Sequence, residues 1–127
     1  MNKKIITTAA FLGMLAIILG AFGAHALKKV LTVDQLATFE TGVKYQMYHA
    51  LFLLFVSLSN DLTQKSKNII FNLIILGVVL FSGSIYLLAT RTIFNIDFSV
   101  IGILTPIGGL FLISGWFLLI YKYLTLK

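Results

Sequence analysis

The side chains of this chain that could do chemistry are few, and they gather in two stretches. "GAFGAHALKK" places His25 at the end of a long apolar run, and "TGVKYQMYHAL" places Tyr45, Gln46 and His49 at the start of another. Histidines can ligate haem or a metal or pass a proton, and tyrosine and glutamine can orient them or hold a ligand. A metal site is the least expected, because the sequence offers no obvious third ligand. The chain has no cysteine, which excludes disulfides and thiolate chemistry.

The composition is that of a membrane protein. Of its 127 residues, 59% are hydrophobic and only 11% are charged, which lies far outside the range of soluble domains. The formal net charge is +6, but the lysines stand singly or in pairs between apolar runs instead of forming a patch. We therefore expect no nucleic-acid partner. The lysines are expected to orient a multi-pass protein of the cell membrane and to contact the headgroups of the lipid bilayer.

Four segments are long and apolar enough to cross a bilayer, whose core of about 30 Å needs roughly 20 helical residues. We predict helices over about 5–24, 33–59, 69–90 and 106–124. The predicted fold is an all-α bundle of four transmembrane helices in a single domain over residues 1–127. The first run imitates a secretion signal, but it is longer than the roughly 7 to 15 apolar residues of such signals. We therefore expect it to be a retained helix.

Two sequence patterns predict where helices begin. Thr32 and Gln35 have the spacing of a capping box, which starts the second helix well before its apolar run. In "TPIGG", Thr105 is suited to be an N-cap and Pro106 to occupy the first helical position, so the last helix is predicted to begin at Pro106. The alternative is one helix from Phe98 that is kinked at the proline.

Both chain ends are predicted to lie in the cytoplasm. With four spans and the N-terminus inside, the cytoplasmic side carries six basic residues, Lys3, Lys4, Lys65, Lys67, Lys122 and Lys127. The far side carries four, Lys28, Lys29, Lys44 and Arg91. Because cytoplasmic loops are enriched in lysine and arginine, this bias favours the stated orientation.

One face of the second helix is polar well into its apolar run. At about 100° per residue, a single sector holds Gln35, Thr38, Gly42, Tyr45, Gln46 and His49. Polar groups in lipid cost free energy, so this sector is expected to face the bundle interior. Four spans bring further polar residues to the same, extracytoplasmic half. The predicted polar cluster consists of His25, Tyr45, Gln46, His49, Arg91 and Thr105.

The two histidines also have a structural interpretation. His25 would then bond a carbonyl at the end of the first helix. His49 would be a buried neutral ring that is hydrogen-bonded to Gln46 or Thr105. The sequence leaves both the functional and the structural interpretation open.

Glycines in two helices are suited to close helix packing. Gly13 and Gly20 belong to a stripe of small residues along the first helix, and Gly108, Gly109 and Gly115 lie in the last. Small side chains let neighbouring backbones approach closely, so packing is the expected role of all five glycines.

Four motifs in order resemble one known family. "GAFGAHALK", "TGVKYQMYHAL", "FSGSIYLL" and "TPIGGLFLISGW" are similar to the small bacterial membrane proteins called domain of unknown function four-two-three, which have eukaryotic transmembrane relatives. The resemblance spans almost the whole chain. It implies a four-helix integral membrane protein without a settled activity, and it assigns no catalytic residue.

Three functions fit these residues. The first is a non-enzymatic membrane protein, with no cofactor, whose polar cluster binds a small molecule, a lipid headgroup or a partner. The second is a small transporter or proton-conducting element that uses Tyr45 and His49, as a homo-oligomer because four short helices enclose little space. The third is a haem-binding electron carrier with His25 and His49 as ligands.

Overall fold

The computed structural model describes residues 2–95 and 97–127, and every regular element within them is a helix. In chain order the elements are α1 (Asn2–Ile18), the π-helix η1 (Leu19–Gly23), α2 (Ala24–Leu27), α3 (Val33–Leu58), α4 (Gln64–Ala89), α5 (Arg91–Phe94) and α6 (Phe98–Leu124). The all-α prediction is therefore confirmed for the described residues.

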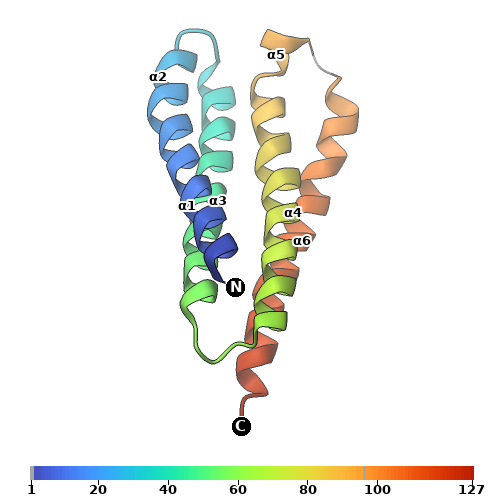
Figure 1. Cartoon of the computed structure of the whole chain (residues 1–127). Coiled ribbons are helices and arrows are strands. Elements are labelled where there is room, and N and C mark those ends of the chain that lie inside the picture. The colour runs from blue at the N-terminus through green and yellow to red at the C-terminus, as the bar shows by residue number, and fades with distance from the viewer. Residues whose placement is uncertain (1, 96) are drawn as a thin grey trace.

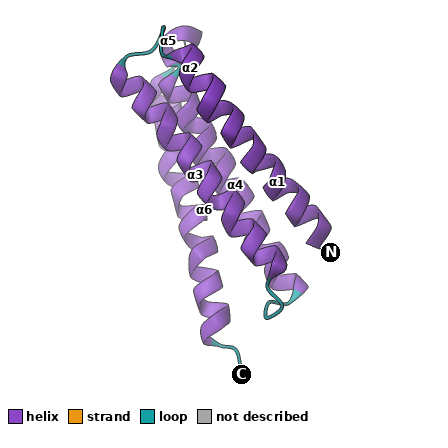
Figure 2. Ribbon diagram, turned by 90° about the vertical axis from the view of Figure 1, so that its left-hand side faces the viewer, coloured by secondary structure: helices purple, strands orange, loops and turns teal. Residues whose placement is uncertain are grey.

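The helices form two hairpins that pack side by side (Figure 1). In one hairpin α1, η1 and α2 run along α3, and in the other α4 runs along α6. α3 also packs on α4, so these two helices form the middle of the molecule. Both chain ends lie toward the turn between α3 and α4, whereas α2 and α5 lie at the opposite end (Figures 1 and 2). We call these the terminal end and the α2–α5 end.

The surface of the bundle is suited to lipid. In the described part of the chain, three helical stretches are long and apolar enough to cross a membrane, Asn2–Leu27, Gln64–Ala89 and Ser99–Leu124. α3 is as long as α4, at 26 residues, but Glu40, Lys44 and its polar sector make it less apolar. Large apolar side chains such as Phe22 and Phe117 are exposed on the outside. This exposure fits a protein surrounded by hydrocarbon instead of water.

The apolar core occupies the terminal half of the bundle. It combines the first turns of α1 with the second half of α3 and the first half of α4, and Leu53, Val56, Ile70 and Ile74 are almost completely buried. In lipid, such packing stabilises the bundle mainly through van der Waals contact. The polar sector of α3 lies mostly in the other half of the bundle, and His49 at its end contacts the core residue Phe52.

The helix starts depend on capping side chains. Thr32 Oγ1 accepts a hydrogen bond from Gln35 N, and Gln35 Oε1 accepts one from Thr32 N, which confirms the predicted capping box of α3. The third helix was predicted from residue 69, but α4 begins at Gln64, because Thr63 caps it by accepting from Ser66 N. Hydropathy missed these first turns since they are polar.

The prediction that the last helix begins at Pro106 is wrong. α6 begins at Phe98 and runs through the proline, so its start agrees with the alternative of one helix from Phe98. The N-cap is Asp97, whose carboxylate accepts hydrogen bonds from the backbone N–H and the hydroxyl of Ser99. These two bonds hold the pKa of Asp97 below its ordinary value. Pro106 has no N–H, so the carbonyl of Gly102 lacks its helical donor, a loss that membrane helices tolerate.

The first helix contains a π-helical turn that the sequence did not predict. Between α1 and α2, η1 widens the helix over Leu19–Gly23. Its glycines lie close to α3, since a Cβ at Gly20 would meet Val43 at 3.2 Å and one at Gly23 would meet Phe39 at 3.0 Å. The predicted continuous helix over 5–24 is thus interrupted, and hydrophobic periodicity carries no signal for this change of hydrogen bonding.

Candidate functional site

The polar sector of α3 packs against other helices of the bundle. Gly42, Gln46 and His49 are all buried, whereas Tyr45 on the edge of the sector is 40% exposed. Their spacing of four and three residues puts the three buried positions on one face of the helix. This face is where α3 meets side chains or backbone of α1, α4 and α6.

Gln46 joins three helices through its amide. Its Nε2 donates to the backbone carbonyl of Leu12 on α1 at 2.9 Å, and its Oε1 accepts from the Tyr86 hydroxyl on α4 at 2.7 Å. Both ends of the amide are therefore hydrogen-bonded. Tyr86 was not among the predicted site residues, because "FSGSIYLL" gives no indication of which side chain turns toward α3.

Gly42 provides the room that Tyr86 needs. A Cβ at this position would lie 2.6 Å from Tyr86 Cε1, which is far inside van der Waals contact. The carbonyl of Gly42 also accepts a hydrogen bond from the Ser82 hydroxyl at 2.8 Å. The backbone of α3 thus approaches α4 closely at this point.

His49 is held by two hydrogen bonds. The indole N–H of Trp116 on α6 donates to His49 Nε2 at 3.0 Å, so Nε2 is the unprotonated nitrogen. The other nitrogen, Nδ1–H, then donates to the carbonyl of Tyr45 at 2.6 Å. These partners define a neutral ring with one tautomer. The prediction that His49 is hydrogen-bonded to Gln46 or Thr105 is wrong. The ring is hydrogen-bonded instead to Trp116, the only tryptophan of the chain.

An open hollow of about 330 Å³ lies beside this histidine. It is lined by Tyr45, His49, Phe81, Gly109, Leu112, Ile113 and Trp116, from α3, α4 and α6. Tyr45, Ile113 and Trp116 are exposed, so the hollow opens sideways on the outer surface of the bundle. It offers apolar and aromatic walls with the polar atoms of Tyr45, His49 and Trp116 among them.

Thr105 and Arg91 lie elsewhere. Ser84 Oγ donates to the carbonyl of Phe81, so the Thr105 hydroxyl donates to Ser84 Oγ, at 2.5 Å. This bond ties α6 to α4 next to Pro106. Arg91 Nη1 donates to the carbonyl of Leu88 at 2.7 Å, where α4 ends. A cation at a helix C-terminus is electrostatically favourable.

The structure does not bring His25 to His49. His25 is exposed on α2, and the neighbouring Gly23 lies against Phe39. Phe39 precedes His49 by ten residues of α3, which rise about 15 Å. The six predicted residues therefore do not form one cluster. α3 extends two turns beyond its apolar run, so His49 lies several turns away from His25 and the α2–α5 end.

The predicted packing glycines differ in how tightly they are packed. A Cβ at Gly108 would lie 2.3 Å from Phe81 N, and one at Gly115 would lie 2.6 Å from Ile74 Cδ1. At Gly13 and Gly109 the nearest atoms would be at 3.8 Å and 3.7 Å, which are ordinary contacts. Gly77 was missed, although a Cβ there would meet Leu112 at 2.5 Å.

Comparison with known proteins places this architecture in a family. Residues 19–109, which include η1, α3 and α4, match the family described as "Protein of unknown function (DUF423)". The chain belongs to this family. It is 40% identical over 118 residues to a UPF0382 membrane protein of Staphylococcus saprophyticus, covering 93% of this chain and 94% of that protein. No solved structure matches it.

Relatives in other bacteria are also named as membrane proteins. The chain is 38% identical over 127 residues to the UPF0382 membrane protein YwdK of Bacillus subtilis, covering 96% of this chain and 99% of that one. It is 34% identical over 130 residues to the UPF0382 inner membrane protein YgdD of Escherichia coli, covering 99% and 93%. This DUF423 protein is thus a membrane protein of an uncharacterised family.

Proposed function

We propose that this DUF423 protein crosses the cell membrane four times, with both termini in the cytoplasm, and that the hollow beside His49 binds a small amphipathic molecule from the surrounding lipid. The binding is non-enzymatic. The hollow carries the proposal, because it combines apolar walls, open to the outside of the bundle, with a few polar atoms from three helices. Ligand sites of proteins have this composition.

The orientation is supported by charge. Both termini and the α3–α4 turn lie at one end of the bundle (Figure 1). This terminal end carries six of the ten basic residues. The Escherichia coli relative is named an inner membrane protein, which agrees with a location where the positive-inside bias applies.

The size of the hollow favours a small molecule over a whole lipid. Its volume of about 330 Å³ lies at the lower end of the range of roughly 300 to 1,000 Å³ for ligand pockets. A ring or short chain with one hydrogen-bonding group would place its apolar part against Phe81 and Leu112. Its polar group would meet Tyr45 or the His49–Trp116 pair.

The geometry favours binding over the other two functions. A proton relay through His49 would have to break the bond from Trp116 or the bond to Tyr45, because each ring nitrogen is engaged. Haem held by both histidines would need them on one iron, yet they are separated by more than about 15 Å of helix. His25 and His49 therefore do not form a ligand pair.

A comparison of two glycine variants tests the proposal. Gly109→Leu adds a side chain at the wall of the hollow, while Gly102→Leu adds one on the same helix where nothing lies within 4 Å of a Cβ. We expect mass spectrometry of organic extracts to find the same amphipathic molecule with the wild-type protein and with Gly102→Leu, but not with Gly109→Leu.

The single tryptophan provides a second readout. Trp116 lines the hollow, so its emission should shift when the extracted molecule is returned to delipidated wild-type protein. Gly109→Leu should show no shift. Identical extracts from all three proteins, or an emission that does not respond in the wild type, would contradict the proposal.

A further inference from the structure

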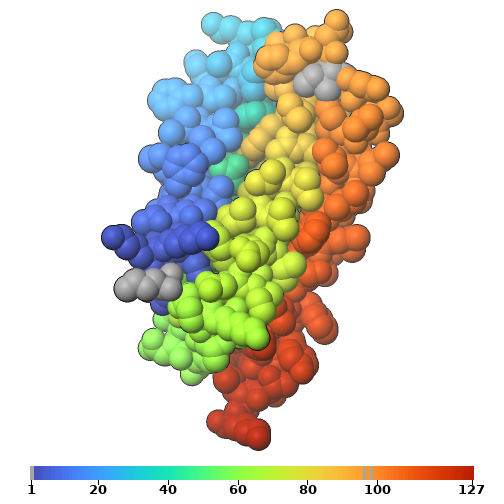
Figure 3. All heavy atoms as spheres, turned by 45° about the vertical axis from the view of Figure 1, so that its right-hand side comes forward, coloured from blue at the N-terminus to red at the C-terminus, as the bar shows by residue number. Residues whose placement is uncertain are grey.

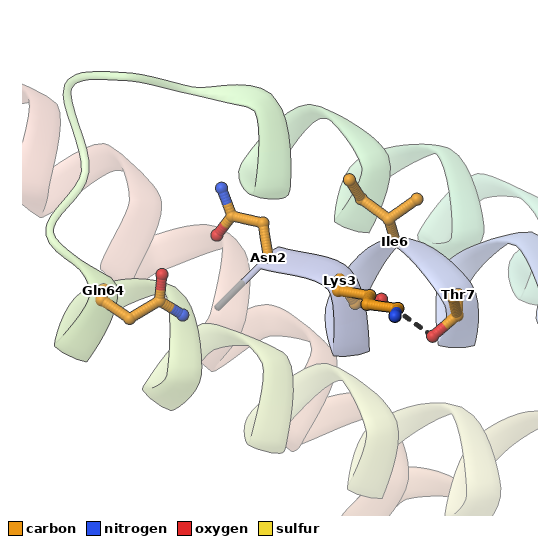
Figure 4. Close-up of a pocket in the computed structure, with 5 residues that line it drawn as sticks. All are labelled: Asn2, Lys3, Ile6, Thr7 and Gln64. Carbon is orange, nitrogen blue, oxygen red and sulfur yellow. Dashed lines mark hydrogen bonds between the residues drawn. The ribbon is translucent and has the colours of Figure 1, made fainter.

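A second hollow lies at the terminal end, far from His49. It is an open space of about 610 Å³ between the first turns of α1 and α4, and it is lined by Asn2, Lys3, Ile6, Thr7 and Gln64 (Figure 4). In the space-filling view, the start of α1 lies against the start of α4 (Figure 3). Lys3 and Lys4 directly precede the uncharged run that begins at Ile5, so this hollow lies where the helix meets the lipid headgroups.

Positive charge is concentrated at this end. Six of the ten basic residues and one of the four acids belong to it, so it carries +5 of the formal +6. In residues 2–95 and 97–127, neither Lys3 nor Lys4 is paired with an acid. The one acid, Asp61, lines a different hollow with Ser59 and Tyr123. An anion at Lys3 therefore meets little competition from the protein.

The neighbouring side of α1 adds a second lysine. Lys4 Nζ lies 5.5 Å from the centre of the Phe71 ring, a cation–π contact that holds it against α4. With Asn68, Phe71 and Asn72 it lines an adjoining hollow of about 310 Å³. The two lysines thus stand on both sides of the first turn of α1, each next to α4.

One residue that lines the larger hollow, Asn2, has a polar atom that needs a donor. Asn2 Oδ1 is buried and has no hydrogen-bond partner among the described residues. A buried acceptor without a donor is costly, so it calls for a hydroxyl or an N–H group. Ile6 provides an apolar side to the same space. A fitting occupant thus has an anionic group for Lys3, a donor for Asn2 and an apolar body.

We propose that this hollow binds the headgroup of an anionic phospholipid with hydroxyl groups, such as phosphatidylglycerol. The phosphate accepts from Lys3, with Lys4 adding charge. The side chain of Asn2, a partly buried residue, turns so that its Oδ1, which is covered in the structure, accepts from a headgroup hydroxyl. The first carbons of an acyl chain lie along Ile6. The proposal requires that the protein sits in a bilayer, but it depends neither on the orientation nor on the hollow beside His49.

Native mass spectrometry of the detergent-purified protein with added lipid tests this site. We expect phosphatidylglycerol to bind and phosphatidylcholine not to bind. Phosphatidylmethanol has the same charge as phosphatidylglycerol but no headgroup hydroxyl. It should bind the wild type more weakly than phosphatidylglycerol does. The Asn2→Leu variant should bind the two lipids equally well. Lys3→Gln with Lys4→Gln should weaken binding of phosphatidylglycerol roughly thirtyfold, given the contribution of each lysine at a membrane surface.

The chain provides a matched control pair. Lys28→Gln with Lys29→Gln removes the same charge at the α2–α5 end and should leave the affinity unchanged. Equal losses from the two pairs, or equal binding of phosphatidylcholine, would overturn the proposal in favour of diffuse attraction. Competition by glycerol phosphate or inorganic phosphate at the same affinity would overturn the lipid as occupant. Gly109→Leu should not change this binding, so failure here is distinguishable from failure of the proposed function.

Discussion

At the scale of single residues, two buried polar side chains of α3, Gln46 and His49, have partners on other helices. Trp116 donates to His49, and Tyr86 donates to Gln46, so each bond joins α3 to a different neighbour. No water is present in hydrocarbon to replace a lost partner, and removal of one member leaves the other unsatisfied. These bonds therefore fix how α3 is rotated against α4 and α6.

Substitutions of His49 separate its structural part from its functional part. His49→Leu leaves the Trp116 indole N–H without an acceptor, so we expect a loss of about 1 to 3 kcal/mol in the free energy of unfolding. His49→Gln keeps an acceptor and should fold with a near-normal melting temperature, yet lose binding in the hollow. Leu51→Ala, on the exposed side of the same helix, is the control and should behave like wild type. Full binding by His49→Gln would show that the histidine serves structure alone.

The types and the face of these residues were predictable, but their partners were not. Helical spacing placed Gly42, Gln46 and His49 together, and the structure has all three buried. Trp116 follows His49 by 67 residues and Tyr86 follows Gln46 by 40, so each pairing depends on the rotation of two helices. A single sequence contains no signal for that rotation. His25 was included in the predicted cluster because four spans bring it to the same half of the bundle as His49, but topology does not give the distance between two residues along that half.

At the scale of elements, hydropathy predicts the apolar part of each long helix, whereas the capping residues determine where each helix begins. The capping box of Thr32 and Gln35 was predicted correctly. The N-caps Thr63 and Asp97 were not predicted, and their helices begin earlier than expected. Pro106 was misleading, since a proline suits both a first turn and the interior of a membrane helix. The π-helical turn η1 leaves no trace in hydrophobic periodicity.

Two adjacent glycines of α6 should respond in opposite ways to the same substitution. In Gly108→Ala the new Cβ would lie 2.3 Å from the backbone nitrogen of Phe81, which cannot move aside, so α6 must shift away from α4. We expect a loss of about 1 to 3 kcal/mol. In Gly109→Ala the nearest atom lies at 3.7 Å, and alanine favours helix by up to about 1 kcal/mol, so stability should hold or rise. Equal melting temperatures of the two variants in detergent would refute the α4–α6 contact.

At the scale of the whole molecule, the two ends of the bundle differ in charge. The terminal end carries +5, and the α2–α5 end carries the remaining +1, because Asp34, Glu40 and Asp97 lie among its four basic residues. An asymmetry of this kind orients a membrane protein and attracts anionic lipid to one leaflet. The proposed orientation and the proposed lipid site thus draw on the same distribution of lysines.

Cysteine labelling tests the orientation directly. The chain has no cysteine of its own, and Asn60 and Val30 are exposed, uncharged positions in the turns at the two ends, so Asn60→Cys and Val30→Cys leave the charge bias intact. We expect an impermeant maleimide to label Val30→Cys in intact cells and Asn60→Cys only after the membrane is opened. The physical reason is that four spans put the α3–α4 turn on the same side as the lysine-rich termini. Labelling of both positions from outside would remove the four-span arrangement, and the reverse pattern would invert it while leaving the lipid site at Lys3 in place.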